Sequence, residues 1–268
     1  MTDKIPILLY HDLVSVDCPN EKSNLAAKET VVSINNFESQ IRYLAENNYE
    51  TISINEYFRY IKNEQKSLEG KIIISFDDGH YSNYKLAFPI LVKYGLKATF
   101  FITTNWLNQQ YHLTSDQIKE MIDNGMEIGS HGLTHNFFPD MNSHEIKFEF
   151  SESKRILESI TKQPIHYIAF PGGHYNRTVL RMLEMSDYAG ACSCLQGLNS
   201  KKTNPWLLKR IEIRKSVSAE QFKDIFNPLN IAFYQMVDSL KSLSRRTIGL
   251  NTYSNIRSRL YKYYIFKR

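Results

Sequence analysis

The chain has 268 residues, of which 42% are hydrophobic and 23% are charged, as in an ordinary globular protein with ample apolar material for a core. Its net charge of +5 is uneven, because residues 232–268 hold eight Lys and Arg against one Asp, which leaves −2 for residues 1–231. The body therefore lacks the charge expected of a nucleic-acid-binding protein. Its three cysteines form no Cys-x-x-Cys pair, so disulfides and a cysteine metal site are not expected and a reducing compartment fits best (Cys18, Cys192, Cys194).

The first predicted strand is Ile5–Tyr10, and His11 follows it directly. This apolar run is too short for the core of a signal peptide or for a membrane span, so the sequence favours a cytoplasmic protein. Residues 12–33 are polar and predict a long loop. Apolar residues at helical spacing then predict a helix at about 35–47.

A short strand is predicted at 51–54, and Asn55 is expected to cap the helix that follows it. Tyr57, Phe58 and Ile61 are expected to form the buried face of that helix.

Residues 71–79, KIIISFDDG, are the centre of the sequence. The apolar, β-branched run predicts a buried strand, which ends at two adjacent carboxylates and a glycine. At the end of a strand, Asp77 and Asp78 point to opposite sides of the backbone. Because two close carboxylates repel each other, we expect one to bind a cation and the other to move a proton. The alternative is an ordinary solvated Asp-Asp-Gly turn.

A second polar segment, SHGLTH, follows a predicted strand at 126–129. His131 and His135 are four residues apart, and a helical turn would bring their imidazoles to one ion. Two histidines and one carboxylate make three protein ligands with open positions, which is typical of a catalytic metal site. The alternative is a pair of loop histidines bound to the backbone.

The remaining elements alternate along the chain. We predict helices at 82–94, 115–124, 143–161, 176–186 and 218–226, and strands at 97–103, 165–170, 188–192 and 207–213. Pro89 is expected to kink the first of these helices. Capping boxes predict where the next two begin, at Thr114/Gln117 and at Asn142/Glu145. Alternation of strands and helices predicts a parallel sheet or a βα barrel of about seven strands. Since the polar clusters all follow strands, we expect one shared site at the carboxyl ends of the strands.

With these residues, the chain resembles the NodB-like polysaccharide deacetylases, also called family-four carbohydrate esterases. The resemblance covers roughly residues 5–226 and rests on ISFDDG (74–79), ATFFI (98–102), SHGLTH (130–135) and AFPGGHYN (169–176). It implies an α/β fold, a distorted seven-stranded (β/α) barrel, as the catalytic domain at 1–226. Residues 227–268 would form a basic, partly helical extension.

The resemblance also implies roles for individual residues. Asp78, His131 and His135 are expected to hold one divalent metal ion, usually Zn²⁺. Asp77 is expected to act as the general base, and the backbone N–H of Gly172 to hold the oxyanion. The neighbouring Pro171, Gly173 and His174 are expected to line the substrate groove.

Two departures point to one branch of this family. Many members carry an Arg at the position of Ala169, and many end with a Leu-x-His motif, whereas no His follows His174 here. The permuted branch, similar to the poly-N-acetylglucosamine deacetylases, instead has an N-terminal Tyr-His and a late Arg-Ile. His11 is then expected to be the general acid. Arg210 is expected to replace the missing Arg beside Asp77 and to contribute to substrate binding, with an ordinary strand-end cation as the alternative.

The expected function is metal-dependent removal of N-acetyl groups from an amino-sugar-containing polysaccharide or its precursor. One alternative is a deacetylase or deformylase of a lipid-linked amino sugar, and another is an inactive carbohydrate-binding relative. A non-haem iron oxygenase also uses two histidines and a carboxylate, but Asp77 and the lack of a co-substrate site argue against it. Aromatic residues alternate with cations near the end of residues 232–268, which suits peripheral contact with an anionic membrane; the alternative is a frayed or barrel-packed helix.

Overall fold

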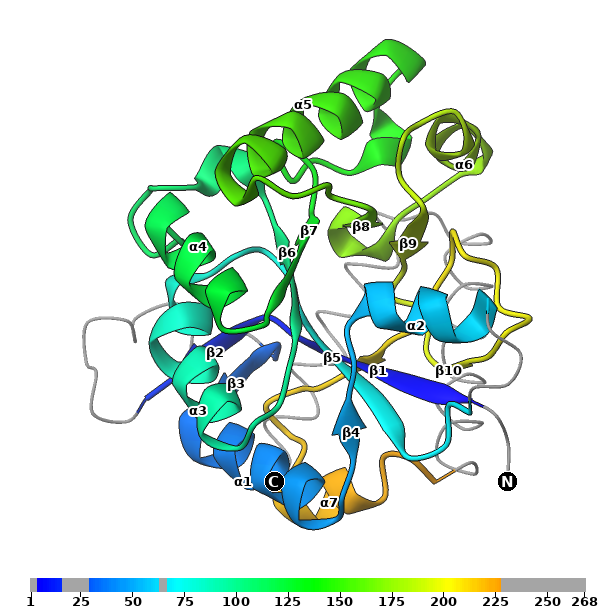
Figure 1. Cartoon of the computed structure of the whole chain (residues 1–268). Helices are drawn as coiled ribbons and strands as arrows, with labels where there is room; N and C mark the ends of the chain where they lie inside the picture. Colours follow the sequence, from blue (N-terminus) through cyan, green and yellow to red (C-terminus); the bar gives the residue numbers. More distant parts are fainter. Residues whose placement is uncertain (1–3, 16–28, 63–66, 228–268) are drawn as a thin grey trace, which may run out of the picture.

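The computed structural model describes residues 4–15, 29–62 and 67–227, which form a curled, mostly parallel sheet surrounded by helices (Figure 1). The strands are β1 (Ile5–Tyr10), β2 (Asp12–Val14), β3 (Val31–Ser33), β4 (Glu50–Thr51), β5 (Lys71–Phe76), β6 (Thr99–Ile102), β7 (Glu127–Ser130), β8 (Tyr167–Ala169), β9 (Gly190–Cys192), β10 (Leu198–Asn199) and β11 (Ile211–Glu212). The α-helices are α1 (Ile34–Glu46), α2 (Ile54–Lys62), α3 (Phe88–Lys93), α4 (Ser115–Asp123), α5 (Ser143–Thr161), α6 (Arg177–Glu184) and α7 (Ala219–Lys223). The basic segment 232–268 and Cys18 lie outside the described residues.

The sheet runs in the order β1-β5-β6-β7-β8-β9, with every neighbouring pair parallel. The segment that contains β11 lies between the two ends of this order. Leu208 bridges to Cys192 of β9, and Ile211 pairs with Leu8 of β1. This segment therefore closes the sheet on itself, and the predicted distorted barrel of about seven strands is confirmed.

Alternation along the strands separates two hydrophobic clusters. One faces the barrel interior and takes alternate strand residues, among them Ile5, Ile7, Ile73, Phe101, Tyr167, Ala169, Cys192 and Leu208. The other takes the intervening residues and packs them against the surrounding helices, among them Leu8, Tyr10, Ile72, Ile74, Phe76, Phe100, Ile128 and Ile168. In Figure 1, α3, α4, α5 and α6 follow one another around the outside of the sheet.

Helix α2 begins at a different residue from the one predicted. The predicted strand at 51–54 is limited to β4, and Asn55 lies inside the helix instead of capping it. Ser53 forms the capping interaction, because its hydroxyl accepts the Glu56 N–H at 3.1 Å while the Glu56 carboxylate accepts the Ser53 N–H at 2.7 Å. Tyr57 and Phe58 are buried as predicted and belong to the interior cluster.

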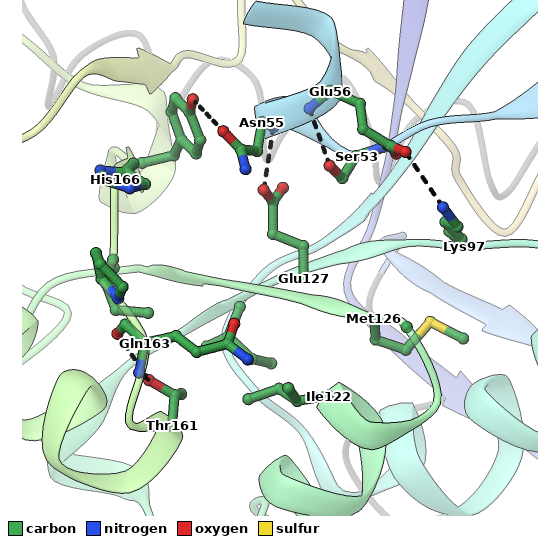
Figure 2. Close-up of a pocket in the computed structure, with 15 residues that line it drawn as sticks. Ser53, Asn55, Glu56, Lys97, Ile122, Met126, Glu127, Thr161, Gln163 and His166 are labelled. Carbon is green, nitrogen blue, oxygen red and sulfur yellow. Dashed lines mark hydrogen bonds and ion pairs between the residues drawn. The ribbon is translucent and has the colours of Figure 1, made fainter. Parts of the chain in front are cut away.

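Glu127, at the start of β7, holds the first turn of α2 (Figure 2). Its carboxylate accepts the N–H groups of Ile54 and Asn55 at 2.9 and 3.0 Å and the hydroxyl of Thr99 at 2.7 Å. A polar cavity of about 270 Å³ lies beside it, with Lys97 and His166 in its wall. Helix α2 thus covers the end of the barrel where the parallel strands begin, which leaves the opposite end for a site.

The predicted helix at 82–94 is present, and two further predictions need correction. The helix contains a π-helical turn, Asn83–Ala87, which continues directly into α3 with Pro89 in the first turn of α3. The predicted loop at 12–33 contains β2 and β3, which pair in parallel; each has only three residues and was not recognised as a strand. The predicted strand at 207–213 pairs as a strand only over β11, because the segment changes partner from β9 to β1.

Both predicted capping boxes are present, at Thr114/Gln117 before α4 and at Asn142/Glu145 before α5. Among the described helices, none combines the length and the apolar character needed to cross a membrane.

Candidate active site

The predicted site residues lie at the carboxyl ends of the strands. His11 follows β1, the Asp77–Asp78 pair follows β5, and His131 follows β7. Tyr10 and Phe76 are paired in register, and the Asp77 N–H donates to the Tyr10 carbonyl at 3.0 Å. His11 and Asp77 therefore leave adjacent strands side by side.

Asp78, His131 and His135 bring one ligand atom each to within 4.8 Å of one another. Oδ1 of Asp78 lies 3.3 Å from Nε2 of His131 and 3.1 Å from Nε2 of His135. Within the described chain this buried oxygen has no well-formed hydrogen bond. An oxygen and two imidazole nitrogens that converge without hydrogen bonding are arranged as ligands of a divalent metal ion.

The orientation of His131 supports this arrangement. Its ring is buried, and Nδ1 lies 2.9 Å from the carbonyl oxygen of Ala169 at the end of β8. Because only a protonated Nδ1 can donate to a carbonyl, Nε2 carries the lone pair that faces Asp78. A ligand histidine fixed through its second nitrogen is the usual arrangement at protein metal sites.

The turn that carries the two histidines is not helical, so the two imidazoles converge without the helical turn that their four-residue spacing alone would need. Gly132 and His135 have φ values of 79° and 65°, in the left-handed region. The turn is held instead by Glu149 of α5, whose buried carboxylate accepts the N–H groups of Leu133 and Thr134 at 2.7 and 3.2 Å. An irregular backbone and a buried carboxylate replace the helix as the means of orienting His135.

Asp77 faces the barrel interior and a different partner. Nη1 and Nη2 of Arg210 donate to its two carboxylate oxygens at 2.6 and 2.7 Å. Asp77 is 2% exposed and Arg210 is fully buried, and Nε of Arg210 donates to the Ser193 carbonyl at 2.9 Å. Arg210 thus lies beside Asp77, as predicted from the presence of Ala169 where many family members have an Arg. Its complete burial favours a role in holding Asp77 over direct contact with a substrate.

The two carboxylates have different electrostatic surroundings. Burial raises the pKa of Asp77, but the guanidinium of Arg210 and the imidazole of His131 outweigh this and hold that pKa below its usual range. Burial also opposes ionisation of Asp78, yet the surrounding imidazoles of His131, His135 and His80 hold its pKa well below the usual range. Both side chains are therefore ionised at neutral pH, each beside its own cationic or donor partner.

His11 lies partly buried next to Asp77. Its backbone carbonyl accepts a hydrogen bond from the Asn83 side chain at 2.7 Å, which fixes the backbone at this position. Its Nδ1 is buried and has no hydrogen-bond partner in the described part of the chain. The geometry thus places the imidazole of His11 beside Asp77, at the carboxyl end of the neighbouring strand.

The Pro171–Gly173 turn forms another wall of the site, after β8. Gly172 has a φ of 61°, and a Cβ there would lie 2.9 Å from ring atoms of both Phe137 and His174. No hydrogen bond formed by the Gly172 N–H is found among the described residues. Pro171 is buried, whereas Gly173 and His174 are partly exposed, so only the latter two are placed to contact a ligand.

Sequence reasoning missed Glu149 and gave Arg210 only as one of two interpretations. A signal for Glu149 was present, because it lies at the helical spacing of Ile146, Phe150, Ser153 and Leu157, the buried face of α5. A carboxylate on an otherwise buried face needs hydrogen-bond donors, and a nearby irregular turn supplies them. Trp106 was also left out, although its ring packs 4.8 Å from the ring of His135.

Three comparisons relate this geometry to known proteins. A protein-family model described as polysaccharide deacetylase matches residues 64–191. A Bacillus subtilis protein that bears the name polysaccharide deacetylase YxkH is 30% identical over 219 residues, which cover 82% of this chain and 75% of the relative. The poly-beta-1,6-N-acetyl-D-glucosamine N-deacetylase of Staphylococcus aureus is 28% identical over 206 residues, which cover 71% of this chain and 70% of the relative.

The fold is also found in a solved structure, that of the Streptococcus pyogenes deacetylase PplD in complex with acetate. It superimposes with a TM-score of 0.77 at 30% sequence identity, covering 84% of this chain and 99% of that protein.

Proposed function

Because the chain belongs to the polysaccharide deacetylase family, we propose that it removes N-acetyl groups from an amino sugar of a glycan by metal-dependent hydrolysis. The observation that supports this proposal most strongly is that two adjacent carboxylates have different partners. Asp78 faces two imidazoles in a metal-ligand arrangement, while Asp77 faces Arg210 one residue away. The site thus combines a place for a metal ion with a separate base, which is what metal-assisted hydrolysis needs.

Two relatives support the substrate class. The Staphylococcus aureus relative is named for poly-β-1,6-N-acetyl-D-glucosamine, a polymer of an N-acetylated amino sugar. The Streptococcus pyogenes deacetylase was solved with acetate, which is the acid that hydrolysis of an N-acetyl group releases. We therefore assign an N-acetylglucosamine-containing glycan as the substrate and acetate as the product.

Asp78, His131 and His135 would hold the metal ion through one oxygen and two nitrogens, a ligand set that suits Zn²⁺ with positions left for water and substrate. When bound, such an ion polarises the acyl oxygen and lowers the pKa of a bound water towards about 7. Ala169 fixes the ring of His131, and Glu149 fixes the turn that carries His135.

Asp77 acts as the general base in this proposal. Arg210 holds both of its carboxylate oxygens, so the side chain stays ionised and cannot turn away. The bidentate pairing lowers the basicity of Asp77 while fixing its position, and each carboxylate oxygen keeps a further lone pair for the proton of an attacking water.

His11 acts as the general acid that protonates the leaving amine. Its position beside Asp77, at the carboxyl end of the neighbouring strand, supports this role. The N–H of Gly172, in the turn opposite, would donate to the negative oxygen that develops on the acetyl carbon. The partly exposed Gly173 and His174 would contact the sugar, and Pro171 would shape their turn.

The test is acetate release from N-acetylglucosamine oligomers, measured after chelation and again after Zn²⁺ is restored. Asp78→Ala should lose both bound metal and activity, whereas Asp77→Asn should keep bound metal and lose activity. Metal-independent acetate release would refute the proposal, as would full activity in either variant.

The same assay separates the alternatives. A lipid-linked amino sugar as the preferred substrate would favour the deacetylase or deformylase alternative, and formate would then be measured beside acetate. The sequence feature that suggested membrane contact, residues 232–268, lies outside the described residues. Oligomer binding without any acyl release, from protein shown to hold metal, would favour an inactive carbohydrate-binding relative.

A further inference from the structure

Asp78 has two carboxylate oxygens, and only one of them faces the two ligand histidines. Oδ1 lies 3.3 Å from Nε2 of His131 and 3.1 Å from Nε2 of His135. Oδ2 lies instead 3.3 Å from Nε2 of His80. The second oxygen therefore has an imidazole partner to which the proposed mechanism gives no role.

The backbone of the Asp78–Gly79 turn brings His80 next to this carboxylate. Asp78 and Gly79 have φ values of 75° and 78°, both in the left-handed region, so the chain turns sharply after β5. A Cβ on Gly79 would lie only 3.2 Å from Cγ2 of Ile102, which shows how closely the turn packs on the end of β6. This close packing limits how far the turn can shift, so His80 stays within reach of Asp78.

The segment before α4 holds His80 from the other side. His80 and His112 form an antiparallel bridge, and the Tyr81 N–H donates to the Tyr111 carbonyl at 2.8 Å. The rings of His80 and His112 stack with centroids 5.5 Å apart and an angle of 24° between their planes. Both the backbone and the ring of His80 are therefore fixed.

The same segment also supports one of the ligand histidines. The ring of His112 packs on that of Trp106 with centroids 5.0 Å apart, and Trp106 packs on His135 at 4.8 Å. A row of four rings thus runs from His80 to His135 along one side of the metal-ligand cluster. His80 belongs to the structural support of this cluster.

The position of His80 is that of a partner to a ligand. Asp78, His131 and His135 bring one atom each to within 4.8 Å of one another, and within the described ranges His80 is not part of this group. The side chains of His80 and Asp78 are each 15% exposed, so water has little access to the contact between them. Hydrogen bonds to a ligating carboxylate fix its orientation at a metal ion.

We propose that His80 is a positioning residue, whose Nε2–H donates to Oδ2 of Asp78 and keeps Oδ1 turned towards the metal ion. This inference rests on the metal site of the proposed function. Because the hydrogen bond occupies Oδ2, Asp78 binds the ion through one oxygen, and coordination positions stay open for water and substrate.

The test compares variants that remove the donor with one that retains it. His80→Phe keeps a ring against His112 but loses the nitrogen. His80→Gln can place an amide nitrogen where Nε2 lies, whereas the shorter side chain of His80→Asn cannot. Zn²⁺ affinity is measured by competition with a coloured chelator. We expect it to fall about 10–100-fold in His80→Phe and His80→Asn and to recover in part in His80→Gln.

Two controls separate positioning from general damage to the fold. His166→Phe, at an exposed residue at the opposite end of the barrel, should keep the wild-type Zn²⁺ affinity. Metal-free His80→Phe and His80→Gln should unfold at the same urea concentration in the presence of chelator. X-ray absorption at the zinc edge then counts the imidazole ligands, and we expect two in the wild type and two in His80→Phe.

Wild-type Zn²⁺ affinity in His80→Phe would overturn the inference, as would equal affinities of His80→Gln and His80→Asn. Three imidazole ligands in the wild type and two in His80→Phe would also overturn it, because His80 would then be a ligand itself. A lower unfolding midpoint in metal-free His80→Phe than in His80→Gln would assign the difference in affinity to folding and overturn it as well.

The failure of this inference and that of the proposed function give different results. Zn²⁺ affinity that falls in His80→Phe, without acetate release by the wild type, would retain the positioning role and reject the proposed activity. Acetate release by the wild type, with unchanged Zn²⁺ affinity in His80→Phe, would retain the proposed activity and reject the positioning role. A wild-type protein that binds no Zn²⁺ would overturn both.

Discussion

Replacing Arg210 with Met should destabilise the protein strongly, because Met fills a similar volume but leaves the Asp77 carboxylate without its partner. Asp77 is 2% exposed and would lose hydrogen bonds of 2.6 and 2.7 Å to the guanidinium. Breaking a buried ion pair in this way costs about 3–5 kcal/mol. For a chain of this size that corresponds to a fall in Tm of roughly 6–20 °C.

The assay is urea unfolding at pH 7 in the presence of a chelator, so that metal binding does not contribute to stability. A double-mutant cycle with Asp77→Leu isolates the pair. We expect each single variant to be destabilised and the double variant Asp77→Leu/Arg210→Met to recover much of the loss, because neither buried charge is then left alone. Arg155→Met is the matched control, since Arg155 pairs with Glu152 on the exposed surface of α5 and should give no measurable change.

A loss below about 1 kcal/mol in Arg210→Met, the level of an exposed ion pair, would refute the reasoning that burial makes this pair strong. A double variant less stable than both single variants would refute it as well.

Other predictions follow from the same geometry. His11→Ala should lower kcat about 10²–10⁴-fold with bound metal unchanged, and loss of metal from this variant would contradict its assignment as general acid. Glu149→Gln should weaken metal affinity in chelator competition, because the turn that carries His135 loses its charged acceptor; unchanged affinity would show that the turn is held otherwise. Glu127→Ala should cost about 1.5–3 kcal/mol in urea unfolding without changing kcat, since Glu127 holds α2 at the far end of the barrel. Burial raises the pKa of Glu127 above 4.5, so the folded wild-type protein binds more protons than the unfolded chain and gains stability from Glu127 as the pH falls. The destabilisation caused by Glu127→Ala should therefore grow as the pH falls from 7 towards 4.5. A destabilisation that shrinks over this range would contradict the raised pKa.

Much of the barrel was predictable because strand geometry is local. The apolar runs that became β1 and β5 were recognised with their observed bounds, and the capping boxes before α4 and α5 predicted where those helices begin. Short elements were not predictable in the same way. β2 and β3 are three-residue strands held by each other, and no local pattern distinguishes them from a loop.

The sequence by itself predicted different partners for Asp77 and Asp78, because two adjacent carboxylates repel each other. It also determined that the polar clusters gather at one end, because parallel strands share their carboxyl ends. It did not predict the orientation of the two carboxylates: Asp78 has a left-handed φ of 75°, and both carboxylates approach Nε2 of His131, at 3.9 and 3.3 Å. Only the tertiary structure decided which partners these side chains meet. Arg210 reaches Asp77 across 133 residues because the segment between β9 and β1 closes the barrel, and Glu149 orients the turn of His135 because α5 packs beside it. Such pairings depend on register and closure, which arise from the whole chain and leave no local pattern to read.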